Sequence, residues 1–364
     1  MQRTITNRQM VFILFTTIST ASVVTIAKTM AMSAGHGAWL TLLLASILFS
    51  VMAGLIVKLN QMNEGKMLYE YSQKLTGKFI AVIIGLFYLV YFFVFSLYLC
   101  NTFDLLIKSS FLIKTPVWAM LLAGMPIYGF IAYKGIRNIG RLAEIFGILF
   151  LLVTVILFVS MLLQGTFSFI LPLYNPAETG KYLLSLKDTI EPFLGIELLL
   201  VIPFTNKNKK AAKTAVFTIL GIGLFYILDV YGCFAMIGKD EIVYHRFPLV
   251  DAIRLVEYPN IEFLQRIDVI YETIGFMRVF VGKSVIYLVI VELLCKMLPK
   301  AERIVLVIVV GVAVTLASLT TIGIPDILAL LASILSIGGI AAAFVIPLIL
   351  LVIAKVKKNA KKGR

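Results

Sequence analysis

Long apolar segments alternate with short polar loops along the whole chain. Ten segments approach or exceed the roughly 20 apolar residues that a membrane-spanning helix requires. The predicted spans are about Met10–Met30, Ala38–Val57, Phe79–Leu99, Pro116–Ala132, Ala143–Leu163, Leu183–Phe204, Ala212–Met236, Ile267–Met297, Ile304–Thr321 and Ile327–Ile353. The pattern predicts an all-α integral membrane protein with ten transmembrane helices.

Two of these spans, the first and the sixth, are interrupted near their middles. In span one, six of the ten residues of Thr16–Thr25 carry hydroxyls, and in span six Glu191–Glu197 holds two carboxylates, Pro192 and Gly195. At this depth, irregular backbone and charged side chains are tolerated only where they are buried in protein or line a cavity. Broken helices at corresponding positions of two halves mark the midplane substrate site of secondary transporters. We therefore predict that spans one and six lie against each other, with non-helical backbone at Thr20–Thr25 and Glu191–Glu197.

Simpler interpretations of the two interruptions stay open at this stage. Pro192 could merely kink span six, with Glu191 and Glu197 paired inside the bundle. The small residues of span one could serve close helix packing instead of a ligand. Lys28, near the outer end of span one, could extend its ammonium to the membrane surface or pair with either glutamate.

A small zwitterion would suit a pocket made from hydroxyls, glycine backbone and an aromatic wall. The ligand-binding candidates are Thr20, Ser22, Thr25, Tyr91, Phe193, Gly195 and Glu197, with Lys28 and Glu191 as candidate charge partners. Glu197 is the leading candidate because a carboxylate at the midplane costs roughly 2.5–3.5 kcal/mol and needs a partner or a function. We expect it to accept a ligand ammonium, to pair with Lys28 or to exchange a proton.

The distribution of basic residues predicts the topology. With both termini in the cytoplasm, the inner loops and tail hold 22 of the 33 Lys and Arg residues, and the outer loops hold eight. This asymmetry agrees with the positive-inside rule and with an even number of spans. The net charge of +14 is spread over these loops, which favours contact with anionic lipid and gives no basis for nucleic-acid binding.

No catalytic or metal-binding pattern accompanies the spans. The three cysteines lie in or at the ends of apolar segments without metal-ligand spacing, and no nucleotide-binding, hydrolase or metalloprotease motif occurs. We expect neither enzymatic activity nor a cofactor or metal. Residues 1–364 are expected to form a single membrane domain with a short disordered basic tail at 355–364. An amphipathic pattern around Leu249, Ile253 and Val256 predicts a short interfacial helix in the outer segment 237–266.

An ordered set of short motifs resembles the spore germination permease family, the membrane B subunits of nutrient germinant receptors, within the amino acid–polyamine–organocation superfamily. The motifs lie at Gly35–Trp39, Leu112–Pro116, Gly135–Arg141, Leu171–Pro172, Phe193–Glu197 with Pro203, and Phe263–Asp268. Ala27 departs from the family pattern, which often has proline in span one, and Arg137, Gly37 and Gln265 replace acidic residues.

The resemblance implies a LeuT-type fold, an inverted repeat of five plus five spans with helices one and six broken. It implies a receptor subunit that binds a small germinant such as an amino acid and acts with an A-type subunit and a lipoprotein C-type subunit in the inner spore membrane. A secondary amino acid transporter is the main alternative. A scaffold with a vestigial pocket is a third.

Overall fold

The structure, a computed structural model, describes residues 5–63, 65–202, 208–258 and 266–362. Helices account for nearly all of the chain described. The α-helices are α1 (Asn7–Ser22), α2 (Ile26–Ser33), α3 (Ala38–Met62), α4 (Leu68–Thr76), α5 (Lys78–Ser110), α6 (Val117–Lys134), α7 (Ile136–Gln164), α8 (Thr179–Leu184), α9 (Ala211–Ile237), α10 (Pro248–Arg254), α11 (Ile267–Met297), α12 (Arg303–Thr321), α13 (Pro325–Ile340) and α14 (Ile346–Lys362).

Most of the predicted spans coincide with these helices, although α5 continues to Ser110, beyond the predicted end at Leu99, and α7 begins at Ile136, before the predicted start at Ala143. Eight helices of the described chain are long and apolar enough to cross a membrane, and α1 with α2 would make a ninth as one bent span. The sixth predicted span contains no continuous helix in the part that the structure describes, which excludes Pro203 and Phe204. The count of ten spans therefore stays a prediction.

Both predicted breaks are present. α1 ends at Ser22, α2 begins at Ile26, and the two helices are bent by 61° relative to each other. Span six follows α8 as three short 3₁₀ helices, η4 (Ser185–Thr189), η5 (Glu191–Phe193) and η6 (Ile196–Leu200). Since α1 packs against η5 and η6, and α2 against η4, the two broken spans lie side by side as predicted.

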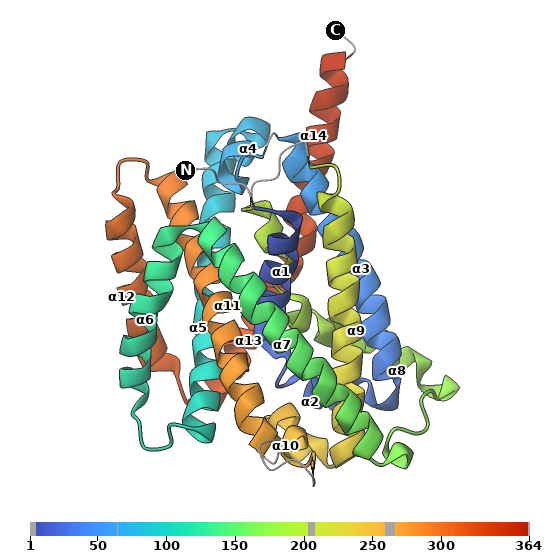
Figure 1. The fold of residues 1–364 in the computed structure, drawn as a ribbon. Helices are drawn as coiled ribbons and strands as arrows, with labels where there is room; N and C mark the ends of the chain where they lie inside the picture. The colour runs from blue at the N-terminus through green and yellow to red at the C-terminus, as the bar shows by residue number, and fades with distance from the viewer. Residues whose placement is uncertain (1–4, 64, 203–207, 259–265, 363–364) are drawn as a thin grey trace.

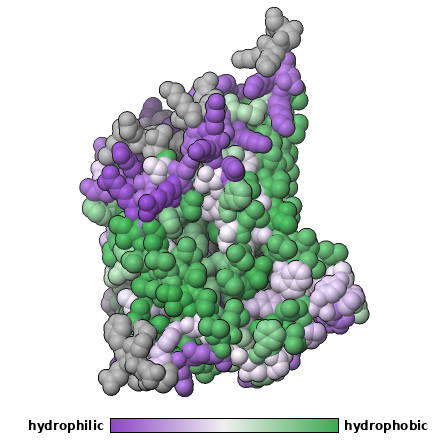
Figure 2. Space-filling view, turned by 45° about the vertical axis from the view of Figure 1, so that its right-hand side comes forward, coloured by the Kyte–Doolittle hydropathy of each residue, from purple (hydrophilic) through white to green (hydrophobic). Residues whose placement is uncertain are grey.

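Both termini lie at one end of the bundle (Figure 1). A broad belt of apolar side chains separates this hydrophilic end from the opposite end, where exposed polar side chains are sparser (Figure 2). The predicted interfacial helix is α10, at the end opposite the termini. Leu249 and Ile253 on this helix and Val256 just after it are buried. The predicted segment around it is described only outside residues 259–265.

Two features of the C-terminal span differ from expectation. The helix changes to a π-helical turn at Ala341–Val345 before α14 begins. The expectation of a disordered basic tail is wrong, because α14 continues as a helix to Lys362 and projects beyond the bundle (Figure 1). Lysine and alanine favour helix, and Lys357 Nζ donates to the backbone oxygens of Lys74 and Leu75 at the end of α4.

Candidate functional site

The two breaks meet where Gly195 approaches α1. Gly195 has a φ of +118°, and a Cβ at this position would lie 2.8 Å from Ile18 Cγ1. Only glycine adopts this conformation readily and leaves room for the neighbouring side chain. The hydroxyl of Tyr226 lies 3.1 Å from the backbone oxygen of Ile18 and 2.9 Å from that of Pro192. One tyrosine on α9 therefore links backbone oxygens of both broken spans.

The carboxylate of Glu197 accepts hydrogen bonds from the backbone and from a side chain at the break of span six. It accepts the backbone N–H of Gly195 at 3.0 and 2.9 Å and the hydroxyl of Tyr91 at 2.8 Å. The residue is fully buried. A carboxylate at the start of η6 satisfies a backbone donor that the break leaves without a helical partner. This geometry gives Glu197 the role of holding the turn together.

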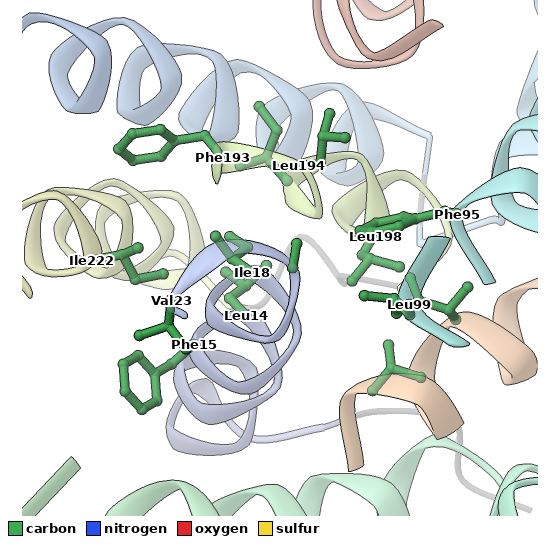
Figure 3. Close-up of a cluster of buried hydrophobic side chains, with 14 of the residues drawn as sticks. Leu14, Phe15, Ile18, Val23, Phe95, Leu99, Phe193, Leu194, Leu198 and Ile222 are labelled. Atoms are coloured by element: carbon green, nitrogen blue, oxygen red, sulfur yellow. The ribbon is translucent and has the colours of Figure 1, made fainter. Parts of the chain in front are cut away.

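Apolar side chains fill the space around this junction. Leu14 and Ile18 of α1 approach the segment that carries Phe193 and Leu194, while Leu198, Phe95 and Leu99 gather beside them (Figure 3). All seven side chains are fully buried. We call these seven residues the apolar plug. The plug packs the centre of the bundle where the two broken spans meet α5.

On the other side of the break lies a cavity of about 620 Å³. It is lined by α2, α5, α13, the segment of η4 and η5, and the loop before α10, through residues that include Thr25, Thr29, Tyr98, Asn101, Lys187, Asp188, Glu191, Arg246, Phe247, Ser333 and Ser336. Its size falls within the range of about 300–1,000 Å³ typical of small-molecule sites.

Glu191 provides the carboxylate of this cavity. Oε1 accepts the hydroxyls of Ser22 at 2.7 Å and Tyr98 at 2.8 Å. Both hydrogen bonds described for this side chain reach the same oxygen, and Glu191 is only partly buried. Its second oxygen is thus available to a cation in the cavity.

Further polar groups give the cavity both signs of charge. Lys187 and Arg246 supply cations, and Asp188 supplies a second carboxylate. Asn101 is fully buried, and its Oδ1 has no hydrogen-bond partner within the described chain, although its Nδ2 donates to Thr321. An unpartnered acceptor beside a cavity costs free energy that a ligand donor could recover.

The structure separates the predicted site residues into three groups, of which two lie at the break. Thr25 and Glu191 line the cavity, and Ser22 contacts Glu191 from behind. Tyr91, Gly195 and Glu197 instead form the turn beneath it.

The other predicted site residues lie in the packing of the bundle. Phe193 stacks on Phe49 at a centroid distance of 5.0 Å, and Thr20 lies against Gly282 of α11. The alternative that Lys28 pairs with a glutamate is not realised, because Lys28 Nζ donates to the backbone oxygen of His245 at 3.1 Å.

Sequence reasoning missed two partners. Tyr98 was not among the candidates. It lies seven residues from Tyr91, so both tyrosines are on one face of α5, and each donates to one glutamate of span six. Arg278 of α11 is buried, donates to Ser19 Oγ of α1 and lies 4.1 Å from the ring centroid of Phe150. It joins α11 to the first half of span one.

Comparison with known proteins identifies the family. The family model described as spore germination protein matches residues 4–323. The chain belongs to the spore germination protein family. Spore germination protein YndE of Bacillus subtilis (strain 168) is 25% identical over 282 residues, 76% of each chain. Spore germination protein B2 of the same organism is 25% identical over 272 residues, 72% of each chain.

A solved structure confirms the fold of this family member. The crystal structure of MhsT in complex with L-phenylalanine superposes with a TM-score of 0.63 at 15% identity, covering 94% of this chain and 97% of that one. The LeuT-type fold that the family resemblance implied is thereby confirmed, as is a multi-pass membrane protein. The family also confirms the predicted function, a B subunit of a germinant receptor, with a transporter of the same fold as the alternative.

Proposed function

We propose that this spore germination protein binds a small zwitterionic germinant, an amino acid, in the 620 Å³ cavity above the break of span six. The ligand ammonium would contact Glu191, and its carboxylate would face Lys187 and Arg246. Thr25 and the partly satisfied amide of Asn101 would offer further hydrogen bonds. The observation that carries the proposal is the position of Glu191, held by Ser22 and Tyr98 with one oxygen toward the cavity.

The arrangement of charges favours a zwitterion over a purely cationic or apolar solute. A cavity with carboxylates and cations can neutralise both ends of an amino acid, while the apolar residues Leu328, Ala332 and Ile337 of α13 can contact its side chain. The mixture of a few polar groups with apolar walls is typical of small-molecule sites. MhsT, of the same fold, was crystallised with an amino acid, L-phenylalanine.

The location and partners of the protein belong to the same proposal. We place it in the inner spore membrane with both termini in the cytoplasm, as a single membrane domain. The cavity then opens to the outside, and the partners are an A-type subunit and a lipoprotein C-type subunit. The positive-inside asymmetry of the loops supports this orientation, and the family supports the partners.

The proposal is tested with radiolabelled amino acids on the purified protein in lipid nanodiscs. A panel of amino acids should yield at least one ligand with saturable binding. Glu191→Gln should weaken that binding about 10- to 100-fold, because a hydrogen bond to a charged group contributes about 1.5–3 kcal/mol. The matched control is Glu241→Gln, which changes an exposed outer carboxylate away from the cavity and should leave binding unchanged. Unchanged affinity in Glu191→Gln would place the ligand elsewhere.

A second measurement separates receptor from transporter. The protein is reconstituted in proteoliposomes and supplied with the amino acid that binds. A receptor should bind without accumulating the solute inside. Accumulation that Glu191→Gln abolishes would support the transporter alternative at the same site.

A further inference from the structure

A second cavity lies on the membrane-facing side of the bundle, far along the chain from the broken spans. It has a volume of about 550 Å³ and is bounded by α6, α11 and α12. Its walls include Leu122, Gly129, Phe130, Ile308, Val312 and Leu316. Every one of these side chains is apolar, so the cavity suits hydrocarbon and offers little to a polar solute.

Two glycines allow this groove to be deep. A Cβ at Gly311 would lie 2.7 Å from the hydroxyl of Tyr287, and one at Gly129 would lie 3.4 Å from the same atom. Tyr287 is buried at the base of the groove and donates its hydroxyl to the backbone oxygen of Val307. The hydroxyl at the base of the groove therefore already has an acceptor, and the surface that the base presents to the groove is apolar.

The groove is as long as one leaflet of a membrane is thick. Its wall on α12 runs from Ile304 to Leu316, and a rise of 1.5 Å per residue gives a length of about 18 Å. Half of a hydrocarbon core about 30 Å thick is about 15 Å. α12 begins at the end of the bundle where both termini lie (Figure 1), and its lining residues stop at Leu316, before the helix ends at Thr321.

Basic side chains lie around the opening of the groove at the end where both termini lie. Lys134 Nζ lies 5.1 Å from the ring centroid of Phe130, a wall residue. Arg303, adjacent to Ile304, donates to the backbone oxygen of Ala132 at 3.2 Å, which ties the start of α12 to the end of α6. It also pairs with Glu292 of α11 at 2.7 Å. Lys300 is exposed just before it. Two exposed lysines thus stand where a lipid headgroup meets the hydrocarbon.

We propose that this groove is a binding site for an anionic phospholipid. One acyl chain lies between α6 and α12 against Gly129 and Gly311, and the phosphate contacts Lys134 and Lys300. The apolar lining, the length of one leaflet and the basic mouth together fit a lipid molecule of the leaflet on the side of the termini. A transmembrane helix of another protein would fit the apolar wall but would not require the two lysines.

The acyl-chain part of the proposal has a matched pair of variants. Val312 lines the groove and Val309 does not, yet both lie on α12 and both are 53% exposed. The protein is reconstituted with equal amounts of phosphatidylglycerol and phosphatidylcholine, extracted into a mild detergent, and its bound lipids are counted by native mass spectrometry. Val312→Trp should fill the groove and remove the retained phosphatidylglycerol, and Val309→Trp should retain it.

The headgroup part is tested by charge. The double variant Lys134→Gln with Lys300→Gln should bind phosphatidylglycerol about 30-fold more weakly, since each basic residue near an anionic surface contributes about 1 kcal/mol. Binding of phosphatidylcholine should not change. Lys58→Gln removes an exposed lysine outside the groove and should have no effect.

Two results would overturn the proposal. Equal retention of phosphatidylglycerol in Val312→Trp and Val309→Trp would show that the groove holds no lipid. Loss of another membrane polypeptide from the purified complex in Val312→Trp, with lipid unchanged, would identify the groove as a protein interface.

Discussion

The two glutamates of span six stand six residues apart, yet they have opposite environments. Glu191, on the side of the outer loops, is partly exposed, shares one oxygen between Ser22 and Tyr98 and borders a 620 Å³ cavity. Glu197, on the side of the termini, is fully buried and saturated by Gly195 and Tyr91. The comparison teaches that a carboxylate in a broken span can bind a ligand or stabilise the break, and that its hydrogen bonds distinguish the two roles.

Gly195 produces this difference. In a regular 3₁₀ helix with three residues per turn, positions six apart would share a face. The left-handed conformation of Gly195 redirects the chain between the two residues, so Glu197 turns back onto the Gly195 N–H while Glu191 stays at the cavity. The four predictions below test this division, in order of decreasing expected effect.

Replacing Gly195 should have the largest effect. Gly195→Leu places a side chain at positive φ, which costs about 1–2 kcal/mol, and forces overpacking against Ile18, which costs about 1–3 kcal/mol. We expect a loss of about 3 kcal/mol in unfolding free energy, measured as a lower thermal midpoint and a lower abundance in membranes. Gly221→Leu is the control, because an exposed glycine on α9 with open space around its Cβ should tolerate the change. A stable Gly195→Leu protein would contradict the close contact of the two breaks.

Glu197→Gln should lower stability by about 2 kcal/mol, because an amide replaces a buried carboxylate that accepts three hydrogen bonds. Ligand affinity per folded molecule should change much less than in Glu191→Gln. Both quantities are measured on the same preparation, by thermal unfolding and by equilibrium binding. A stable Glu197→Gln protein with abolished binding would reverse the roles assigned to the two glutamates.

Tyr91→Phe and Tyr98→Phe form a matched pair on α5, two helical turns apart. Each removes one hydroxyl that donates to a glutamate, an effect of about 1.5 kcal/mol. Tyr91→Phe should reduce the thermal midpoint with little effect on ligand affinity. Tyr98→Phe should weaken ligand binding about tenfold with little effect on the midpoint. Identical behaviour of the two variants would remove the distinction between the two sides of the break.

Lys28→Met should have the smallest effect. The side chain loses one hydrogen bond to the His245 backbone oxygen, about 1 kcal/mol or less, and the segment before α10 should exchange its amide hydrogens faster. Lys181→Met, which removes an exposed lysine of α8, serves as the control. A strong loss of ligand binding in Lys28→Met would indicate that Lys28 acts on the glutamates after all.

The fold was largely predictable because the bilayer imposes length and polarity on each span. The positions of the breaks followed from residues that a lipid-facing helix excludes, namely the hydroxyls before Thr25 and the Glu191–Glu197 run. The breaks were found at Val23–Thr25 and around Gly195. The π-helical turn at Ala341–Val345 was not predicted, because nothing in its sequence distinguishes it from a regular helix. The hydroxyl of Tyr88 donates to the Ala342 oxygen within this turn.

The site was less predictable than the fold. Sequence reasoning favoured Glu197 as the ligand contact, whereas the cavity borders Glu191, since the direction of a side chain in irregular backbone does not follow a period. Side-chain partners that are far apart in the sequence could not be predicted either. Arg278 and Ser19 are 259 residues apart, and only the packing of α11 on α1 joins them.

The apolar plug has a consequence for what the protein can measure. Its seven side chains are fully buried and gather where α1 meets the broken sixth span (Figure 3). A solute that reaches the cavity from only one side of the membrane equilibrates with the compartment on that side alone. While the plug stays closed, occupancy of the proposed cavity follows the concentration of nutrient in that compartment and not the gradient across the membrane, as a receptor requires; a plug that opens during each cycle would correspond to the transporter alternative.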